Sequence, residues 1–344
     1  MNYADFTIRS KKEWDGYIEK TLMHEFFHTW YYHSLNTEGE PLLFVYEETD
    51  FFIAMPLIKR PIKNSLYYDL TSAYGYCGPI SNIDLGKLPE ITKSIFKSEF
   101  VNFMRQENAV CVFSRLHPFL NQCCIFQHDS YLKENGTTLY LDLSLSLEEQ
   151  RSKYDKRVAR QIRKLRKRAY IIKEGDSPEE IRKFTEMYHK NMDRVNASKA
   201  YYFDEKYFAD ILNVHESKNK LLLIYDGSEL ICGALLFLSN NIIRNHLSAT
   251  SPKYLKESPS KLLVDEISII GRRLGKKIFH LGGGVGGRED SLFKFKRLFT
   301  DLKIRDWIWC YINDTVVYKD LVLKSGAITN SESNYFPRYR QPPK

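Results

Sequence analysis

The chain has 344 residues, a hydrophobic content of 43% and a net charge of +8, which describe a folded globular protein long enough for two domains. It contains no apolar run of membrane-spanning length, and its N-terminus lacks the apolar core of a secretory signal, so we expect a cytoplasmic protein without stable membrane insertion. The six cysteines include no C-x-x-C pair and no zinc-like spacing with histidine, so we expect reduced packing residues and no metal site.

Two segments with the same pattern indicate a duplication. Residues 41–60 and 220–239 each contain two apolar runs around a polar turn, and they align without a gap at an offset of 179. The same order of elements follows each segment: a third strand, a helix and a further strand. The predicted elements are 66–70, 89–106 and 110–114 in the first copy, and 242–249, 259–274 and 277–281 in the second.

This order predicts an α+β protein with two equivalent domains, each a mostly antiparallel sheet flanked by helices. We expect an N-terminal domain over residues 1–146 and a C-terminal domain over 147–344, with the C-terminal tail packing back on the first domain. A meander that leads through a helix to another strand resembles the acyltransferase fold called GNAT.

The positive charge is concentrated in residues 151–168, "RSKYDKRVARQIRKLRKR", which hold ten Lys and Arg residues and one Asp. Apolar residues recur there at helical spacing, at Tyr154, Val158, Ile162, Leu165 and Ala169. Such a basic amphipathic helix can be a solvated face, a membrane-surface element or a phosphate binder. Because it has no Trp or Phe to anchor in a membrane interface, we favour phosphate binding, with Arg160 and Arg163 as the contacts.

A glycine-rich segment, "LGGGVGGREDSLFKFKRLF", occupies residues 281–299. The glycines have dinucleotide-binding spacing, but only one predicted strand follows, and Glu289 and Asp290 would repel a pyrophosphate at the start of the next helix. No Gly-Lys-Ser/Thr ends the loop, which excludes a P-loop. We favour close approach of a substrate to the loop backbone over a structural turn. Asp290 is equally suited to cap a helix that begins at Ser291.

With this loop, the chain resembles the Fem-type peptidoglycan bridge aminoacyltransferases (FemA, FemB, FemX), which are tandem GNAT-fold enzymes. The resemblance rests on "KRVARQIRKLRK", on "NHLSAT", on the glycine-rich segment that ends in Phe-Lys-x-x-x-Phe and, more weakly, on "FFHTWYYH", "AYGYCGP" and "NYFPRYR". It implies that aminoacyl-tRNA donates its amino acid to an amine of a cell-wall precursor, with no cofactor. It also implies that Phe295 and Lys296 lie beside the acyl ester, where a fixed ammonium would stabilise an oxyanion.

Further candidate substrate contacts lie in the second half of the chain. Tyr202 belongs to an aromatic segment that can line the acceptor pocket. His246, in "NHLSAT", is either a packed core histidine or a base for the acceptor amine. The complete set of candidate substrate contacts is Arg160, Arg163, Tyr202, Arg244, His246, Gly283, Gly284, Arg288 and Asp290.

Two other functions remain open on the sequence. The first is an N-acyltransferase that uses acetyl-CoA to acylate an amino sugar of a surface polysaccharide. CoA-dependent GNAT domains usually present a glycine-rich loop after the meander, whereas this chain has "TSPKYLKESPSK" there, without glycine, which argues against CoA. The second is a non-enzymatic RNA-binding module. None of these functions involves DNA.

Overall fold

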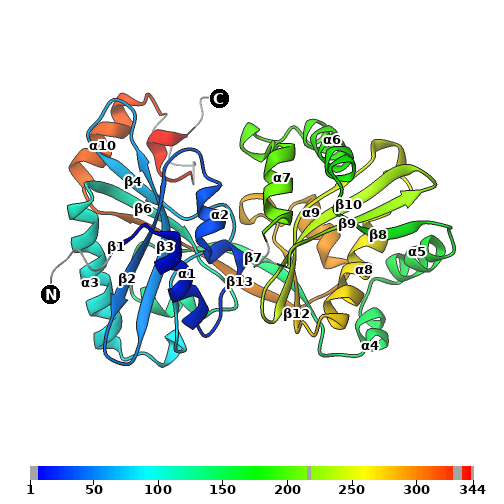
Figure 1. The fold of residues 1–344 in the computed structure, drawn as a ribbon, viewed down its shortest axis with the longest axis horizontal. Coiled ribbons are helices and arrows are strands. Elements are labelled where there is room, and N and C mark those ends of the chain that lie inside the picture. The colour runs from blue at the N-terminus through cyan, green and yellow to red at the C-terminus, as the bar shows by residue number, and fades with distance from the viewer. Residues whose placement is uncertain (1–6, 215–217, 328–334, 342–344) are drawn as a thin grey trace. The chain divides into compact units, whose positions relative to one another are not determined.

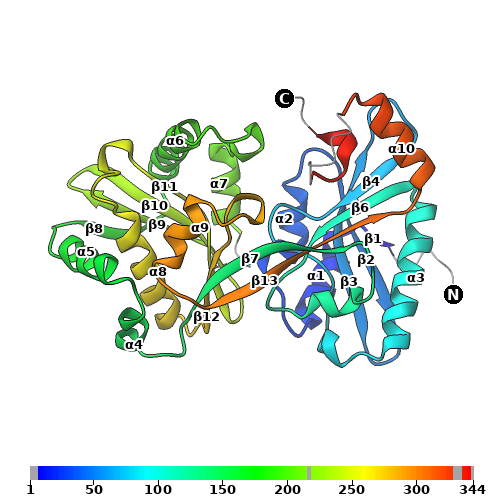
Figure 2. The same ribbon diagram turned by 180° about the vertical axis from the view of Figure 1, so that it is seen from behind.

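The computed structural model describes residues 7–214, 218–327 and 335–341, so Asn334 of the "NYFPRYR" segment lies outside the described residues. Contacts divide the chain into two compact units (Figures 1 and 2). Unit 1 contains residues 1–135 and 305–344, and unit 2 contains residues 136–304. Each unit combines a mainly antiparallel sheet with helices, which confirms the predicted fold class.

Unit 1 is built around a sheet with the strand order β1-β2-β3-β4-β6-β13, and the short strand β5 pairs with β3. Its elements are β1 (Thr7–Ile8), α1 (Lys11–Lys20), α2 (Trp30–Ser34), β2 (Glu40–Glu47), β3 (Phe52–Pro61), β4 (Tyr68–Thr71), β5 (Ile80–Ser81), α3 (Glu90–Gln106), β6 (Ala109–Arg115), β13 (Lys303–Ile312) and α10 (Thr315–Lys324).

The alternation of side chains along β2 explains how both faces of this sheet become buried. Leu42 and Phe44 belong to the core that includes Phe100 of α3. Leu43, which points to the opposite face, belongs to the core that includes Trp14 of α1. The apolar part of β2, residues 41–46, is therefore covered by a helix on each side.

Unit 2 has the strand order β7-β12-β11-β10-β9-β8. Its elements are β7 (Leu132–Asp142, which the chain enters from unit 1), α4 (Leu147–Ser152), α5 (Lys156–Arg166), β8 (Ile171–Gly175), α6 (Pro178–Arg194), α7 (Glu205–Leu212), β9 (Lys220–Asp226), β10 (Glu229–Leu238), β11 (Ile242–Thr250), α8 (Ser260–Arg273), β12 (Ile278–Gly282) and α9 (Ser291–Arg297).

Helices also cover both faces of the unit 2 sheet (Figures 1 and 2). Leu222 of β9 belongs to the core that contains Ile162 of α5 and Ile267 of α8. Leu223 lies on the other face, where Gly233 leaves room for both its side chain and that of Phe184 of α6. The predicted basic helix over residues 151–168 is broken: α4 ends at Ser152 and α5 begins at Lys156. Val158, Ile162 and Leu165 of the predicted stripe are buried on the α8 side, each at most 4% exposed, whereas Ala169 lies beyond the end of α5 and is exposed.

The duplication predicted at an offset of 179 is confirmed. In unit 1 the meander β2-β3-β4 is followed by α3 and by β6, which pairs in parallel with β4. In unit 2 the meander β9-β10-β11 is followed by α8 and by β12, which pairs in parallel with β11. The copies differ in register, because a bulge after Leu230 moves the partner of Leu221 to Leu235, whereas Leu42 pairs with Leu57.

The units divide the chain differently from the boundary predicted at residue 146. Residues 139–142 of β7 pair with β12 in unit 2, and residues 308–312 of β13 pair with β6 in unit 1. Each sheet is therefore completed by a strand distant in sequence from its neighbours: β7 precedes the other strands of unit 2, and β13 follows the other strands of unit 1. Local sequence patterns do not carry this information, because the strand partners are far apart in sequence.

The end of the chain is held in unit 1 by the buried carboxylate of Asp69, which is 0% exposed. Asp69 accepts hydrogen bonds from Arg340 Nε at 2.5 Å and from the Tyr339 hydroxyl at 2.9 Å. It also accepts one from Arg60 Nε at 2.8 Å. Three donors from two distant segments thus converge on one carboxylate.

We predict that Asp69→Asn lowers the free energy of unfolding of unit 1 by about 2 kcal/mol, because two partly buried arginines lose their charged acceptor. Tryptophan fluorescence during urea unfolding reports unit 1 alone, since all four tryptophans lie within it, at positions 14, 30, 307 and 309.

The matched control is Asp320→Asn on α10, which removes an exposed pair with Lys324 whose side chains are 52% and 73% exposed. It should cost less than about 1 kcal/mol. Equal effects of the two substitutions would show that Asp69 does not hold the tail.

Candidate functional site

The candidate site in unit 2 begins where two parallel strands separate. Within the described chain, β11 and β12 pair at three positions, the last of which joins Arg244 to His280. β11 continues to Thr250, while β12 ends at Gly282. Beyond the last pair the strand ends diverge, and the glycine-rich loop follows β12 directly.

The loop is shaped by its own backbone as well as by glycine. Gly282 has a φ of 78°, in the left-handed region that glycine adopts without strain. A side chain at Gly284 would collide with the carbonyl oxygen of Arg288 and with Asp290, and one at Gly283 would collide with the carbonyl oxygen of Thr137. The sequence predicted close approach of a substrate to this backbone, but at Gly283 and Gly284 the chain itself makes the close approach.

Asp290 occupies the start of α9 and fixes the loop, so the predicted capping role is confirmed. Its Oδ1 accepts from the N–H of Phe293 and its Oδ2 from the N–H of Val285, both at 3.0 Å. Burial opposes ionisation of this carboxyl, but hydrogen bonds from backbone N–H groups outweigh burial and lower its pKa. Arg288 is exposed and donates from Nε to the carbonyl oxygen of Val285 at 3.2 Å.

Lys296 lies on α9 with its ammonium turned back to the loop, where Nζ donates to the carbonyl oxygen of Gly283 at 2.6 Å. Phe295 is partly buried against the unit 2 core, with its ring 5.5 Å from that of Phe299 in an edge contact. The structure thus brings together Lys296, Gly283 and the capped turn at Asp290, and it fixes a cation at the divergence of the strands.

Two other candidates, Arg244 and His246, lie on β11, and a third, Tyr202, lies in the segment between α6 and α7. Arg244 is 3% exposed on β11. The ring of His246 stacks on Phe237 with centroids 4.0 Å apart, and its Nε2 lies 3.0 Å from the Tyr207 hydroxyl, a partner that the sequence did not reveal. Tyr202 donates its hydroxyl to Asp193 at 2.8 Å, so its polar end is bound to a surface carboxylate.

Arg160 and Arg163 lie on the exposed face of α5 and line a pocket of about 550 Å³. In the described part of the chain, no ion pair holds either arginine. Arg151, Lys156 and Arg166 also line the pocket, together with a single carboxylate, that of Glu148. Five cations around one cavity are suited to a phosphate group.

The start of α5 is joined to the end of α9. The N–H of Asp155 donates to the carbonyl oxygen of Leu298 at 2.8 Å, and the ring of Tyr154 contacts that of Phe299 with centroids 5.3 Å apart. The cationic pocket and the Lys296 helix therefore belong to one packed substructure of unit 2.

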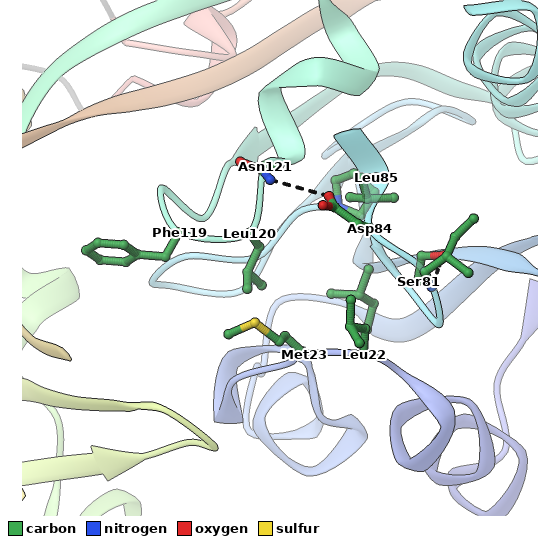
Figure 3. Close-up of a pocket in the computed structure, with 11 residues that line it drawn as sticks. Leu22, Met23, Ser81, Asp84, Leu85, Phe119, Leu120 and Asn121 are labelled. Atoms are coloured by element: carbon green, nitrogen blue, oxygen red, sulfur yellow. Dashed lines mark hydrogen bonds between the residues drawn. The ribbon is translucent and has the colours of Figure 1, made fainter. Parts of the chain in front are cut away.

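A second pocket, in unit 1, has a different character. It has a volume of about 130 Å³ and is lined mainly by aliphatic side chains such as Leu22, Leu85 and Leu120. Figure 3 shows the hydrogen bond that Asn121 donates to Asp84 at 3.3 Å within this lining. The lining residues include no cation, and none was predicted as a site residue, so we do not assign a phosphate-bearing substrate to it.

Among the residues that the structure describes, no helix combines the length and the apolarity needed to cross a membrane. The same residues contain no group of three or more His, Cys, Asp or Glu side chains placed to hold a metal ion.

Comparison with known proteins identifies the domain class. Residues 152–297 match the model of the acetyltransferase (GNAT) domain, a range that contains every candidate site residue. The crystal structure of FemX superposes with a TM-score of 0.71 at 12% identity, covering 91% of this chain and 98% of FemX. The chain has the tandem GNAT fold of FemX. The predicted Fem-type resemblance is thereby confirmed in fold, and the predicted acyltransferase class is confirmed by the domain match.

Other structures share this fold across most of the chain. L-PGS from Bacillus licheniformis has a TM-score of 0.57 at 12% identity, covering 92% of this chain and 96% of L-PGS. A conserved protein of unknown function from Bacteroides thetaiotaomicron has a TM-score of 0.55 at 10% identity, covering 90% of this chain and 98% of its own. No curated protein sequence matches the chain.

We predict that Arg160→Ala combined with Arg163→Ala weakens binding of a phosphate-bearing ligand and flattens its salt dependence, because fewer counterions are released. The slope of log K against log salt concentration, measured with an RNA hairpin and with a nucleoside diphosphate, checks this. Folding should hardly change, since both side chains lie off the buried stripe.

Arg157→Ala with Lys164→Ala is the matched control, because it removes the same charge from the same helix at positions outside the pocket lining. If both double variants lose affinity equally, binding follows the net charge of α5 and not the pocket.

Proposed function

We propose that the protein transfers an aminoacyl group from aminoacyl-tRNA to an amine of a peptidoglycan precursor. The observation that carries this proposal is the fixed Lys296 ammonium at the divergence of β11 and β12, within a GNAT domain. The superposition with FemX over nearly the full length of both chains supports the same assignment.

In this reaction the acceptor nitrogen attacks the carbonyl carbon of the acyl ester. A C–N bond forms, the ester C–O bond breaks, the amine loses a proton, and the ribose hydroxyl of the donor leaves with one. Negative charge develops on the carbonyl oxygen in the transition state. Lys296 supplies the cation that stabilises this charge. An ammonium has three N–H donors, so its bond to Gly283 is compatible with a second bond to the substrate.

The positions of the other groups support further roles in the proposed reaction. The α5 pocket binds phosphate of the substrate through Arg160 and Arg163. His246, whose imidazole is placed by Phe237 and Tyr207, is the candidate to accept the proton of the amine. The amine must be neutral to attack, so a base is needed at or before this step.

The backbone that follows β11 supports an RNA ester as donor over acyl-CoA. Residues 251–259 contain no glycine, and their first part forms a 3₁₀ turn at Pro252–Tyr254. Helix α8 then begins without a side-chain cap, after Pro259. This segment lacks the glycines that let backbone amides close around a pyrophosphate.

The test of the donor is incubation of the purified protein with charged tRNA or with acetyl-CoA, each with candidate amine acceptors, followed by product mass. An aminoacylated acceptor formed only from charged tRNA supports the proposal. An acetylated amino sugar formed from acetyl-CoA would instead identify an N-acyltransferase, and RNA binding without any product would identify a binding module.

We predict that Lys296→Met lowers kcat by about 100- to 1,000-fold and changes KM much less, because the ammonium acts on charge that exists only in the transition state. Steady-state kinetics of the transfer reaction measure both constants. Arg should restore little activity, since its planar fork does not replace a compact ammonium.

The control is Lys294→Met, an exposed lysine on the same helix. It should leave kcat and the melting temperature nearly unchanged. A loss of less than about threefold in kcat for Lys296→Met, which corresponds to under 1 kcal/mol, would remove Lys296 from the mechanism.

A further inference from the structure

The basic pocket rests on a buried carboxylate that the sequence did not single out. Asp265 lies on α8 and is 0% exposed. It accepts from Arg151 Nε at 3.0 Å and Nη2 at 2.6 Å, and from Arg166 Nε at 3.2 Å and Nη2 at 2.5 Å. The Tyr154 hydroxyl donates to the same carboxylate at 3.3 Å. One buried group therefore holds the edges of two guanidinium groups.

Both of these arginines also line the pocket that contains Arg160 and Arg163. Their side chains are 36% and 32% exposed, so each reaches from the buried carboxylate to the solvent side. A guanidinium has five N–H donors in a rigid fork, and the donors turned to the carboxylate fix the plane in which the others lie. Asp265 thus sets the direction in which two of the five pocket cations present their remaining donors, although Nη1 of Arg166 also contacts Glu266 at 2.6 Å.

The surrounding polar contacts lock this arrangement. Gln150 donates to the Ser268 hydroxyl at 3.0 Å and to the Tyr154 hydroxyl at 2.5 Å, and Arg272 donates to Gln150. Burial alone would raise the pKa of Asp265, but the hydrogen bonds and charges of the two arginines outweigh burial and lower it. The carboxylate is therefore ionised. It lies on α8, and its two arginine partners lie on α4 and α5.

Stability alone does not account for such a cluster, because a well-packed apolar replacement of a buried ion pair is often as stable or more stable. Charge alone does not account for it either. A carboxylate lowers the positive potential of the pocket, which weakens the attraction of a phosphate. What the cluster provides is a fixed geometry of the two guanidinium groups.

We infer that Asp265 is a positioning residue of the α5 pocket, which orients Arg151 and Arg166 for bidentate contact with a phosphate group of the substrate. This inference rests on the proposed function, in which the pocket binds phosphate. The phosphate is either the backbone of the RNA donor or the diphosphate of a nucleotide-linked acceptor, and both present the same oxygens.

The experiment compares Asp265→Asn with the unmodified protein in equilibrium binding to a nucleoside diphosphate and, separately, to an RNA hairpin. The substitution keeps the shape of the side chain, removes one negative charge and turns an amide N–H₂ toward one arginine. We expect about tenfold weaker binding of the probe that the pocket accepts, the scale of one lost charge-assisted contact. The probe that weakens identifies the source of the phosphate.

The sign of the change separates positioning from charge. If Asp265 only neutralises the arginines, Asp265→Asn tightens binding, and the inference is wrong. Glu266→Gln is the matched control: it changes the charge of α8 by the same amount and removes only a 2.6 Å contact with Arg166 Nη1. Its affinity should change by less than about twofold, since the contacts of Asp265 stay in place.

A triple variant, Arg151→Gln, Arg166→Gln and Asp265→Asn, removes Asp265 together with both of its arginine partners and separates Glu266, which is 14% exposed, from Arg166. If Asp265 acts through the two arginines, the triple variant binds about as weakly as Asp265→Asn. A much larger loss would show that the arginines bind phosphate without Asp265, which overturns the inference. In acyl transfer, Asp265→Asn should raise KM and leave kcat unchanged, whereas a misfolded site would lower both.

A failure of the proposed function gives a different result. If the unmodified protein binds neither probe, the pocket is not a phosphate site. Both the phosphate-binding role of the pocket and the positioning role of Asp265 are then wrong. If the unmodified protein binds a probe and Asp265→Asn binds it equally well, only the positioning role falls.

Discussion

The candidate site depends on the point at which the parallel pairing of β11 and β12 stops. After Arg244 and His280 the two strands no longer share hydrogen bonds, and their backbone groups need other partners. At this point the loop and helix that follow β12 are held by contacts of their own. Lys296 donates to Gly283, and Asp290 accepts two backbone N–H groups. Lys296 and Asp290 therefore both hold the loop in place and supply charged groups beside it.

This arrangement places a cation before any substrate arrives. The Lys296 ammonium is held 2.6 Å from a carbonyl oxygen, and Phe295 beside it packs on the core. A charge that is already in position requires little reorganisation when an oxyanion forms, which is the main source of electrostatic catalysis. A loose surface lysine would have to lose side-chain entropy first. The packing of a seven-residue helix thus has a direct chemical consequence.

Local patterns in the sequence predicted the basic helix and the duplication, because helical and strand periodicities are properties of neighbouring residues. They did not predict that β7 pairs with β12 in unit 2 or that β13 pairs with β6 in unit 1. Nor did they predict the contacts of Asp265, whose arginine partners lie 114 and 99 residues away. In "KLLVDEISII", Asp265 interrupts a run of apolar residues. Its partners Arg151 and Arg166 become evident only in the folded structure. Glycine spacing predicted close approach at Gly283 and Gly284, but it did not distinguish a ligand from the chain itself.

Contacts between helices α5 and α9 join the pocket lined by Arg160 and Arg163 to the proposed oxyanion site at Lys296. The backbone bond from Asp155 to Leu298 and the contact of Tyr154 with Phe299 are both next to residues of the two functional groups. Because close-packed interiors transmit strain, we expect a shift of α5 to displace α9 as well. Asp265 fixes α5 from the other side through Arg151 and Arg166. In the proposed reaction, a donor with both a phosphate and an acyl ester meets two charged groups whose relative positions are set by one packed unit, so that binding of the phosphate places the ester.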